Sequence, residues 1–119
     1  MANENQIKEI SEVTLNGQTL PLKVNFLAIK NYLKDGESLF EKIGIQTPDA
    51  TLEKLKCALI AGGNENVTDE MCMAIIDETP SVYGNITKTF STYASKFYSI
   101  AEVGNLPAAQ EADSELTKN

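Results

Sequence analysis

Carboxylates are the chemically capable side chains that lie closest together in this sequence. Asp69 and Glu70 stand at the start of a predicted helix, and Asp77 and Glu78 stand near its end. Two carboxylates can act as general acid and general base when their environments separate their pKa values. Here the first pair suits the first turn of the helix, where negative charge is favourable. We therefore interpret all four as solvent-exposed side chains rather than as a catalytic pair.

The other residue types on which active sites are built are missing or badly spaced. The chain has no histidine, which removes the usual general base and the commonest metal ligand. Gly62-Gly63 lacks the Lys-Ser/Thr pair of a phosphate-binding loop, so a helix end is the better interpretation. Cys57 and Cys72 lie in apolar helical segments without CxxC spacing, which favours buried free thiols over a disulfide. The sequence predicts no enzyme, no metal site and no cofactor.

Length and charge narrow the class of protein. The chain has 119 residues, enough for one domain with one modest core. Ten lysines, no arginine and seventeen acidic residues give a formal net charge of -7, which disfavours nucleic acid and anionic membrane surfaces as partners. No apolar run has the length of a membrane span, and the first residues lack the basic and apolar regions of a signal peptide. We expect a protein of the cytoplasm.

A β-hairpin is the clearest local element. Apolar and polar residues alternate on both sides of Asn16-Gly17, the preferred pair for a two-residue type I′ turn. In that register Val13 faces Leu20, and one face of the hairpin is apolar, as packing on helices requires. Pro21 cannot donate a hydrogen bond to a sheet, so its strand is an edge.

Helix-starting and helix-ending residues divide the rest of the chain. Asn25 and Thr68 are predicted N-caps, and Pro80 precedes the last helix. The predicted helices span residues 26–34, 38–43, 50–61, 67–77 and 82–100. The sequence therefore predicts an α+β, mainly α fold in which an N-terminal β-hairpin packs on a bundle of four to five helices. One domain is expected over residues 10–102, with a flexible N-terminus (1–9) and a flexible acidic C-terminal tail (103–119).

The last predicted helix carries a narrow apolar seam along its length. The seam residues are Val82, Ile86, Phe90, Tyr93, Phe97 and Ile100. Their spacing of three and four residues places them within an arc of roughly 80°. The opposite side is rich in Ser and Thr and poor in charge, which hints at contact with another helix or subunit.

Five residues form a candidate surface for a client or for self-association. They are Met71, Met73, Ile76, Tyr83 and Tyr98. The first three belong to a segment that is apolar nearly all the way round, so they are either core or part of an adaptable binding surface, with core the better interpretation. The two tyrosines lie off the seam of the last helix, where an aromatic side chain indicates either an interface or incidental exposure.

Two stretches of the chain have a combined pattern that occurs in a known family. The first consists of Val13–Leu22 and Phe26–Ile29, and the second of Leu55–Gly63, Val67–Met71 and Ile75–Glu78. A hairpin that leads into a short helix, then a helix ending in Gly, then a Val-Thr-acid start of another helix, resembles the tail assembly chaperones of long-tailed, siphovirus-type bacteriophages. The resemblance covers about residues 10–100.

The resemblance implies a non-enzymatic protein that binds the tape measure protein and keeps it soluble until the tail tube polymerises. It further implies a homo-oligomer in the host cytoplasm, with the tail tube protein and a longer frameshifted form of the chain as further partners. The alternative is a structural tail or connector component of the virion. A small enzyme or DNA-binding domain fits least, because histidine and arginine are missing and the net charge is -7.

Overall fold

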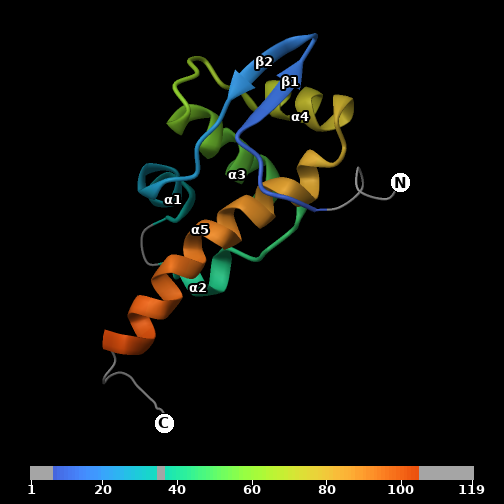
Figure 1. The fold of residues 1–119 in the computed structure, drawn as a ribbon. Coiled ribbons are helices and arrows are strands. Elements are labelled where there is room, and N and C mark those ends of the chain that lie inside the picture. Colours follow the sequence, from blue (N-terminus) through green and yellow to red (C-terminus); the bar gives the residue numbers. More distant parts are fainter. Residues whose placement is uncertain (1–6, 35–36, 105–119) are drawn as a thin grey trace.

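The computed structural model describes residues 7–34 and 37–104, with side chains through Phe97 (Figure 1). In this part of the chain an antiparallel hairpin is followed by five helices. The elements are β1 (Glu12–Leu15), β2 (Gln18–Pro21), α1 (Phe26–Tyr32), α2 (Leu39–Lys42), α3 (Pro48–Ala61), α4 (Asp69–Glu78) and α5 (Val82–Gly104). The predicted fold class, mainly α with an N-terminal hairpin, is confirmed. Residues 1–6 and 105–119 of the predicted tails lie outside the described residues.

The hairpin has the predicted register. Val13 pairs with Leu20, and both side chains are buried. Asn16 and Gly17 have φ values of 54° and 79°, the left-handed conformation that the two-residue turn requires. The Glu78 carboxylate, at the end of α4, accepts a hydrogen bond of 2.9 Å from the backbone N–H of Asn16. Glu78 therefore helps to hold the hairpin turn against α4 instead of facing only solvent.

Side-chain caps begin three of the helices. Asn25, Thr47 and Thr68 each accept a hydrogen bond from the backbone N–H three residues further along the chain. Each cap satisfies one of the N–H groups that the first turn of a helix leaves without a partner. The caps predicted at Asn25 and Thr68 are confirmed.

Each of the five helices has a boundary that differs from the predicted one by one to four residues. α1 ends at Tyr32, because Leu33 has an extended backbone with ψ of 127°. α3 begins at Pro48 instead of residue 50, since proline has no N–H to lose in the first turn and its φ suits a helix. α5 continues past residue 100 to Gly104.

The N-terminal segment before β1 runs beside α5. The backbone N–H of Lys8 donates to the side-chain oxygen of Asn85, and that of Ile10 donates to the Thr89 hydroxyl, both at 2.9 Å. Asn85 and Thr89 are four residues apart and therefore lie one above the other on α5. Part of the predicted flexible N-terminus, residues 7–9, is thus placed against the body of the protein.

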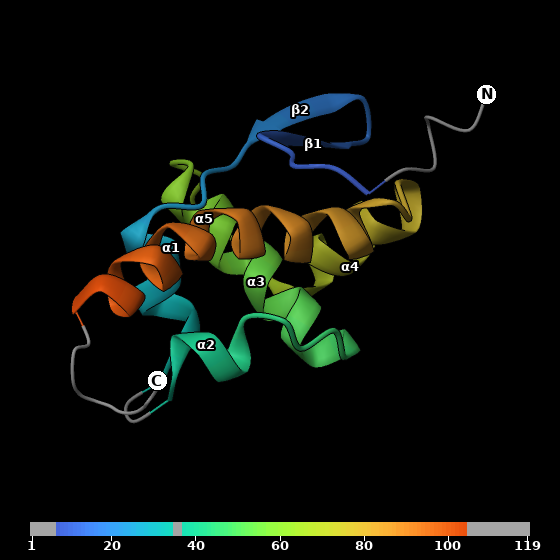
Figure 2. The same cartoon turned by 60° about the horizontal axis from the view of Figure 1, so that its bottom comes forward.

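α3 is the central helix of the fold. It contacts α1, α4 and α5, and Figure 2 shows it crossing beneath α5. Leu55, Ala58 and Leu59 on its inner face are fully buried. Burying each leucine side chain contributes roughly 1.5–3 kcal/mol, so this face supplies much of the hydrophobic stabilisation. The buried seam residues Val82, Ile86 and Phe90 of α5 belong to the same core.

The C-terminal end of α3 lies very close to the chain that leaves the hairpin. A Cβ atom at Gly62 would lie 2.5 Å from the backbone oxygen of Pro21 and 2.7 Å from Leu22 Cα. The side chain of Asn64 also donates to the Pro21 oxygen at 2.7 Å. Gly62 is therefore required by the close approach of two backbones, in addition to ending the helix.

A lysine is buried in the core. The Lys54 side chain is fully buried, and its Nζ donates to the backbone oxygen of Ile45 at 2.7 Å and to the Thr87 hydroxyl at 3.0 Å. It lies 5.5 Å from the centre of the Tyr32 ring and forms no ion pair with a carboxylate among the described residues. Burial lowers the pKa of Lys54 to about 8, and the positive charge of Lys42 adds to the effect.

Replacing Lys54 tests this burial through the pH dependence of stability. Between pH 8 and 10.5 the unfolded chain binds more protons at this lysine than the folded chain does, so the free energy of unfolding rises with pH. We expect the free energy of unfolding of the original protein, relative to that of a Lys54→Met variant, to rise by up to about 3 kcal/mol across this range. Urea unfolding of both proteins at a series of pH values measures the difference. A difference that stays constant or falls with pH would contradict the prediction.

Gly62 provides a second test of the fold. Gly62→Ala forces a methyl group against the backbone of residues 21–22, and we expect it to lower the free energy of unfolding by roughly 1–3 kcal/mol. Gly44→Ala is the matched control, because a Cβ atom at Gly44 meets nothing within 4 Å. Chemical unfolding of both variants measures the two changes. Equal changes in the two variants would show that the close approach has no energetic consequence.

Candidate binding groove

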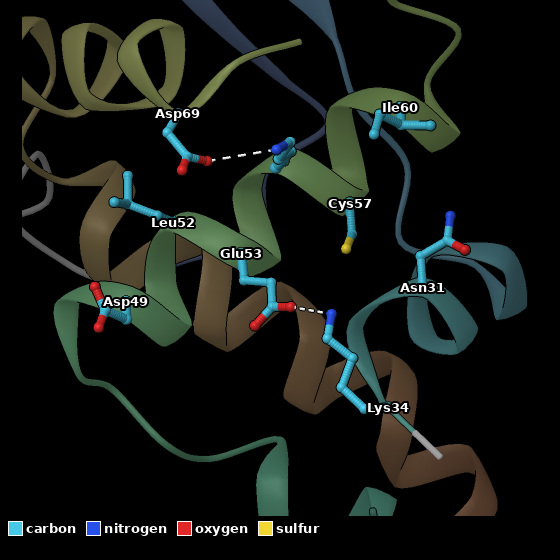
Figure 3. Close-up of a pocket in the computed structure, with 9 residues that line it drawn as sticks. Asn31, Lys34, Asp49, Leu52, Glu53, Cys57, Ile60 and Asp69 are labelled. Atoms are coloured by element: carbon cyan, nitrogen blue, oxygen red, sulfur yellow. Dashed lines mark hydrogen bonds and ion pairs between the residues drawn. The ribbon is translucent and has the colours of Figure 1, made fainter.

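A groove of about 550 Å³ runs along the outer face of α3, between α1 and α4 (Figure 3). We call it the α3 groove. Its lining residues come from α1 with the residues just after it, from α3 and from the start of α4. They are Asn31, Lys34, Asp49, Leu52, Glu53, Lys56, Cys57, Ile60 and Asp69.

The regular spacing of α3 residues builds the floor of the groove. Leu52, Lys56 and Ile60 are four residues apart, so they form one row along the helix. Leu52 is half-buried, and the Ile60 side chain is 42% exposed. Leu52 packs against the core and also lines the groove, whereas Leu55 and Leu59 on the inner face are fully buried.

Two ion pairs join α3 to the neighbouring segments at the rims of the groove. Lys34 pairs with Glu53 on the α1 side, and Lys56 Nζ lies 3.5 Å from an Asp69 oxygen on the α4 side (Figure 3). The Glu53 hydrogen bond raises the pKa of Lys34 above its usual value. Exposed pairs of this kind contribute little to stability. Their effect here is to pair the charges that lie between and beside the apolar residues Leu52 and Ile60.

The thiol in the floor of the groove is not poised for reaction. Cys57 is only 6% exposed, and burial, with the nearby Glu53 charge, raises its pKa to about 11. A thiol with this pKa is almost entirely protonated at neutral pH, whereas the thiolate is the nucleophile. The Cys57 thiol is therefore not a nucleophile at neutral pH.

Exposed apolar side chains continue on both sides of the groove. Leu27, which is 50% exposed, lies one turn before Asn31 on α1. Met73, which is 45% exposed, lies one turn after Asp69 on α4. Helices that present apolar side chains around a shallow groove are suited to binding the apolar face of another helix.

The structure separates the residues of the candidate surface. Met73 is exposed and lies beside the groove, but Met71 and Ile76 are half-buried and pack against the core, in agreement with the preferred interpretation. The Tyr83 hydroxyl donates a hydrogen bond to the backbone oxygen of Gln46, so Tyr83 fastens α5 to the loop before α3. The Tyr98 side chain lies outside the part of the chain whose side chains the structure describes.

The sequence interpretation missed Ile60 in the groove and Leu27 beside it. Both residues stand in apolar helical segments, where they resemble core residues. The eight-residue separation of Leu52 and Ile60, with Lys56 midway between them, was the signal for a second face of the helix.

The chain matches no protein-family model, no curated protein and no solved structure. Residues 7–34 and 37–104 contain no group of His, Cys, Asp and Glu side chains that could hold a metal ion. None of the helices in these ranges combines the length and the hydrophobicity of a membrane span. The geometry of the groove is therefore the basis on which its function can be inferred.

The burial of the two thiols gives a direct prediction. Cys57 and Cys72 are free and buried, and burial raises the pKa of each to about 11. We expect both to react with an aromatic disulfide reagent at neutral pH at least about a hundredfold more slowly in the native protein than in urea. The absorbance of the released thiol measures both rates. Native-state reaction as fast as in urea would show that the groove floor is open to reagents.

Proposed function

We propose that the protein is a tail assembly chaperone of long-tailed bacteriophages, which binds the tape measure protein and keeps it soluble until the tail tube polymerises. The observation that carries the proposal is the α3 groove, in which the half-buried Leu52 and the exposed Ile60 lie beside two ion pairs, with the exposed Leu27 and Met73 on the neighbouring helices. The protein acts in the host cytoplasm and is not an enzyme. Its resemblance to this family over residues 10–100 supports the same function.

The groove supplies the contacts that a client helix needs. Leu52 and Ile60 are eight residues apart, which corresponds to roughly 12 Å along α3. An amphipathic client helix presents apolar residues at positions i, i+4 and i+7, over a similar length. Leu27 and Met73 then cover the two sides of the client's apolar stripe. Binding in this way removes the stripe from water and from contact with other client molecules.

The charges favour a soluble complex of modest affinity. Lysine–carboxylate pairs at the rims can exchange partners with charges that flank the client's apolar stripe, and such exposed pairs add little affinity. The net charge of -7 keeps a complex with an apolar client from associating further. Modest affinity at each site suits a chaperone that must release its client.

Self-association increases the affinity for a long client. A homo-oligomer places several α3 grooves on one tape measure chain, and linked weak sites bind much more tightly than each site alone. A longer frameshifted form of the chain would join the same oligomer and could connect the client to the tail tube protein.

Co-expression with the tape measure protein tests the proposal. We expect the original protein to form a complex with the client, and Ile60→Glu to reduce the soluble client by at least about tenfold, because a carboxylate would be buried against the client's apolar face. The measurements are the amount of soluble client and its recovery with the tagged chaperone.

Ile45→Glu is the matched control for this experiment. Ile45 is 40% exposed, almost the same as the 42% of Ile60, but it precedes α3 and does not line the groove. We expect Ile45→Glu to leave the soluble client unchanged. Equal losses in the two variants would exclude the groove as the binding site. Failure of the original protein to form a complex, with the protein present in stoichiometric amounts in purified particles, would identify a structural tail or connector component instead.

A further inference from the structure

A second apolar surface lies where α1 meets the far part of α5. The Phe26 ring is 61% exposed, and its centre lies 6.1 Å from that of Phe97 on α5. Phe97 in turn lies 5.5 Å from Tyr93, one turn earlier on the same helix. We call these three residues the aromatic surface. The seam of α5 that is buried in the core at Phe90 therefore continues outward as a partly exposed face.

Up to Phe97, the charged side chains on the two helices of this surface are all positive, and Glu102 is the acidic residue in the last turn of α5. α1 carries Lys30, one turn after Phe26, and α5 carries Lys88 and Lys96 as its charged residues from Val82 to Phe97. Lys96 Nζ lies 5.0 Å from the centre of the Tyr93 ring. In a chain with a net charge of -7, this local excess of lysine favours an acidic partner. It also disfavours a second copy of the same surface, because the lysines of two copies would repel each other.

The chain itself supplies an acidic segment next to this surface. α5 ends at Gly104, seven residues after Phe97, which is roughly 10 Å along a helix. The end of α5 projects beyond the other elements in Figure 1. Residues 105–119 follow, with Glu111, Asp113 and Glu115 against Lys118, and with leucines at positions 106 and 116.

We propose that residues 105–119 bind back onto the aromatic surface of the same molecule. The carboxylates of the segment face Lys30 and Lys96, and its leucines cover the exposed Phe26 ring. Fifteen residues can span up to roughly 50 Å when extended, so the segment is long enough to return the roughly 10 Å from Gly104 to Phe97. A tether this short gives an effective concentration in the millimolar range, at which weak apolar and ionic contacts suffice. The segment thereby shields the surface from other chains, whatever the client of the protein is.

Paramagnetic relaxation measurements on the full chain test the proposal. A nitroxide is attached to an Ala112→Cys variant, since the native thiols Cys57 and Cys72 are buried. We expect broadening of the backbone amide signals of Phe26, Lys30 and Phe97. The broadening should fall by at least about threefold when the segment's three carboxylates are neutralised (E111Q/D113N/E115Q), as loss of exposed ion pairs predicts. Salt at about 0.5 M should weaken it as well, because screening then acts within a few ångström.

Two controls give the experiment its specificity. Neutralising Glu9, Glu12 and Glu65, exposed carboxylates elsewhere on the protein, changes the net charge equally and should leave the broadening unchanged. Phe26→Ala should reduce it, without unfolding the protein, because that ring is mostly exposed. Absence of broadening, or equal effects of the two sets of neutralised carboxylates, would overturn the proposal. Broadening seen only between a spin-labelled copy and a separate isotope-labelled copy would also overturn it, in favour of contact between molecules.

Discussion

The burial of α3 is the constraint on which the rest of this structure depends. Its inner face holds the fully buried Leu55 and Leu59, and three other helices pack against it. The contact at Gly62 then brings the exit of the hairpin against the end of the same helix. One helix cannot be covered on every side by so short a chain, because the surface of a small domain is large relative to its volume. The uncovered side of α3 is the α3 groove.

Charge is distributed in a way that follows from this arrangement. Lys54, on the covered side of α3, is held by a carbonyl and a hydroxyl and has a lowered pKa of about 8. Lys56, two residues away on the open side, pairs with Asp69 in contact with solvent. The buried amine loses hydration and gains only neutral partners, whereas the exposed one keeps its water. Two lysines in one helical turn thus have different chemistry because of the faces they occupy.

Most of the fold could be predicted because its elements depend on residues that are close in sequence. The Asn16-Gly17 turn set the register of the hairpin, and caps such as Thr68 set the starts of helices. The class of fold followed from the order of these elements. The boundaries that differed, such as the start of α3 at Pro48, involve one to four residues in the terminal turns of the helices.

The candidate site could not be predicted from neighbouring residues, because it depends on how distant helices pack. Apolar residues at helical spacing establish by themselves that a helix has an apolar face, and the sequence determined this for the seam of α5. Only the tertiary structure decided that Met71 and Ile76 pack against the core, and that Leu52, which also packs against the core, lines a groove with the exposed Ile60. The physical reason is that the exposure of a helical side chain depends on where distant helices cross it, and that crossing depends on the packing of the whole chain.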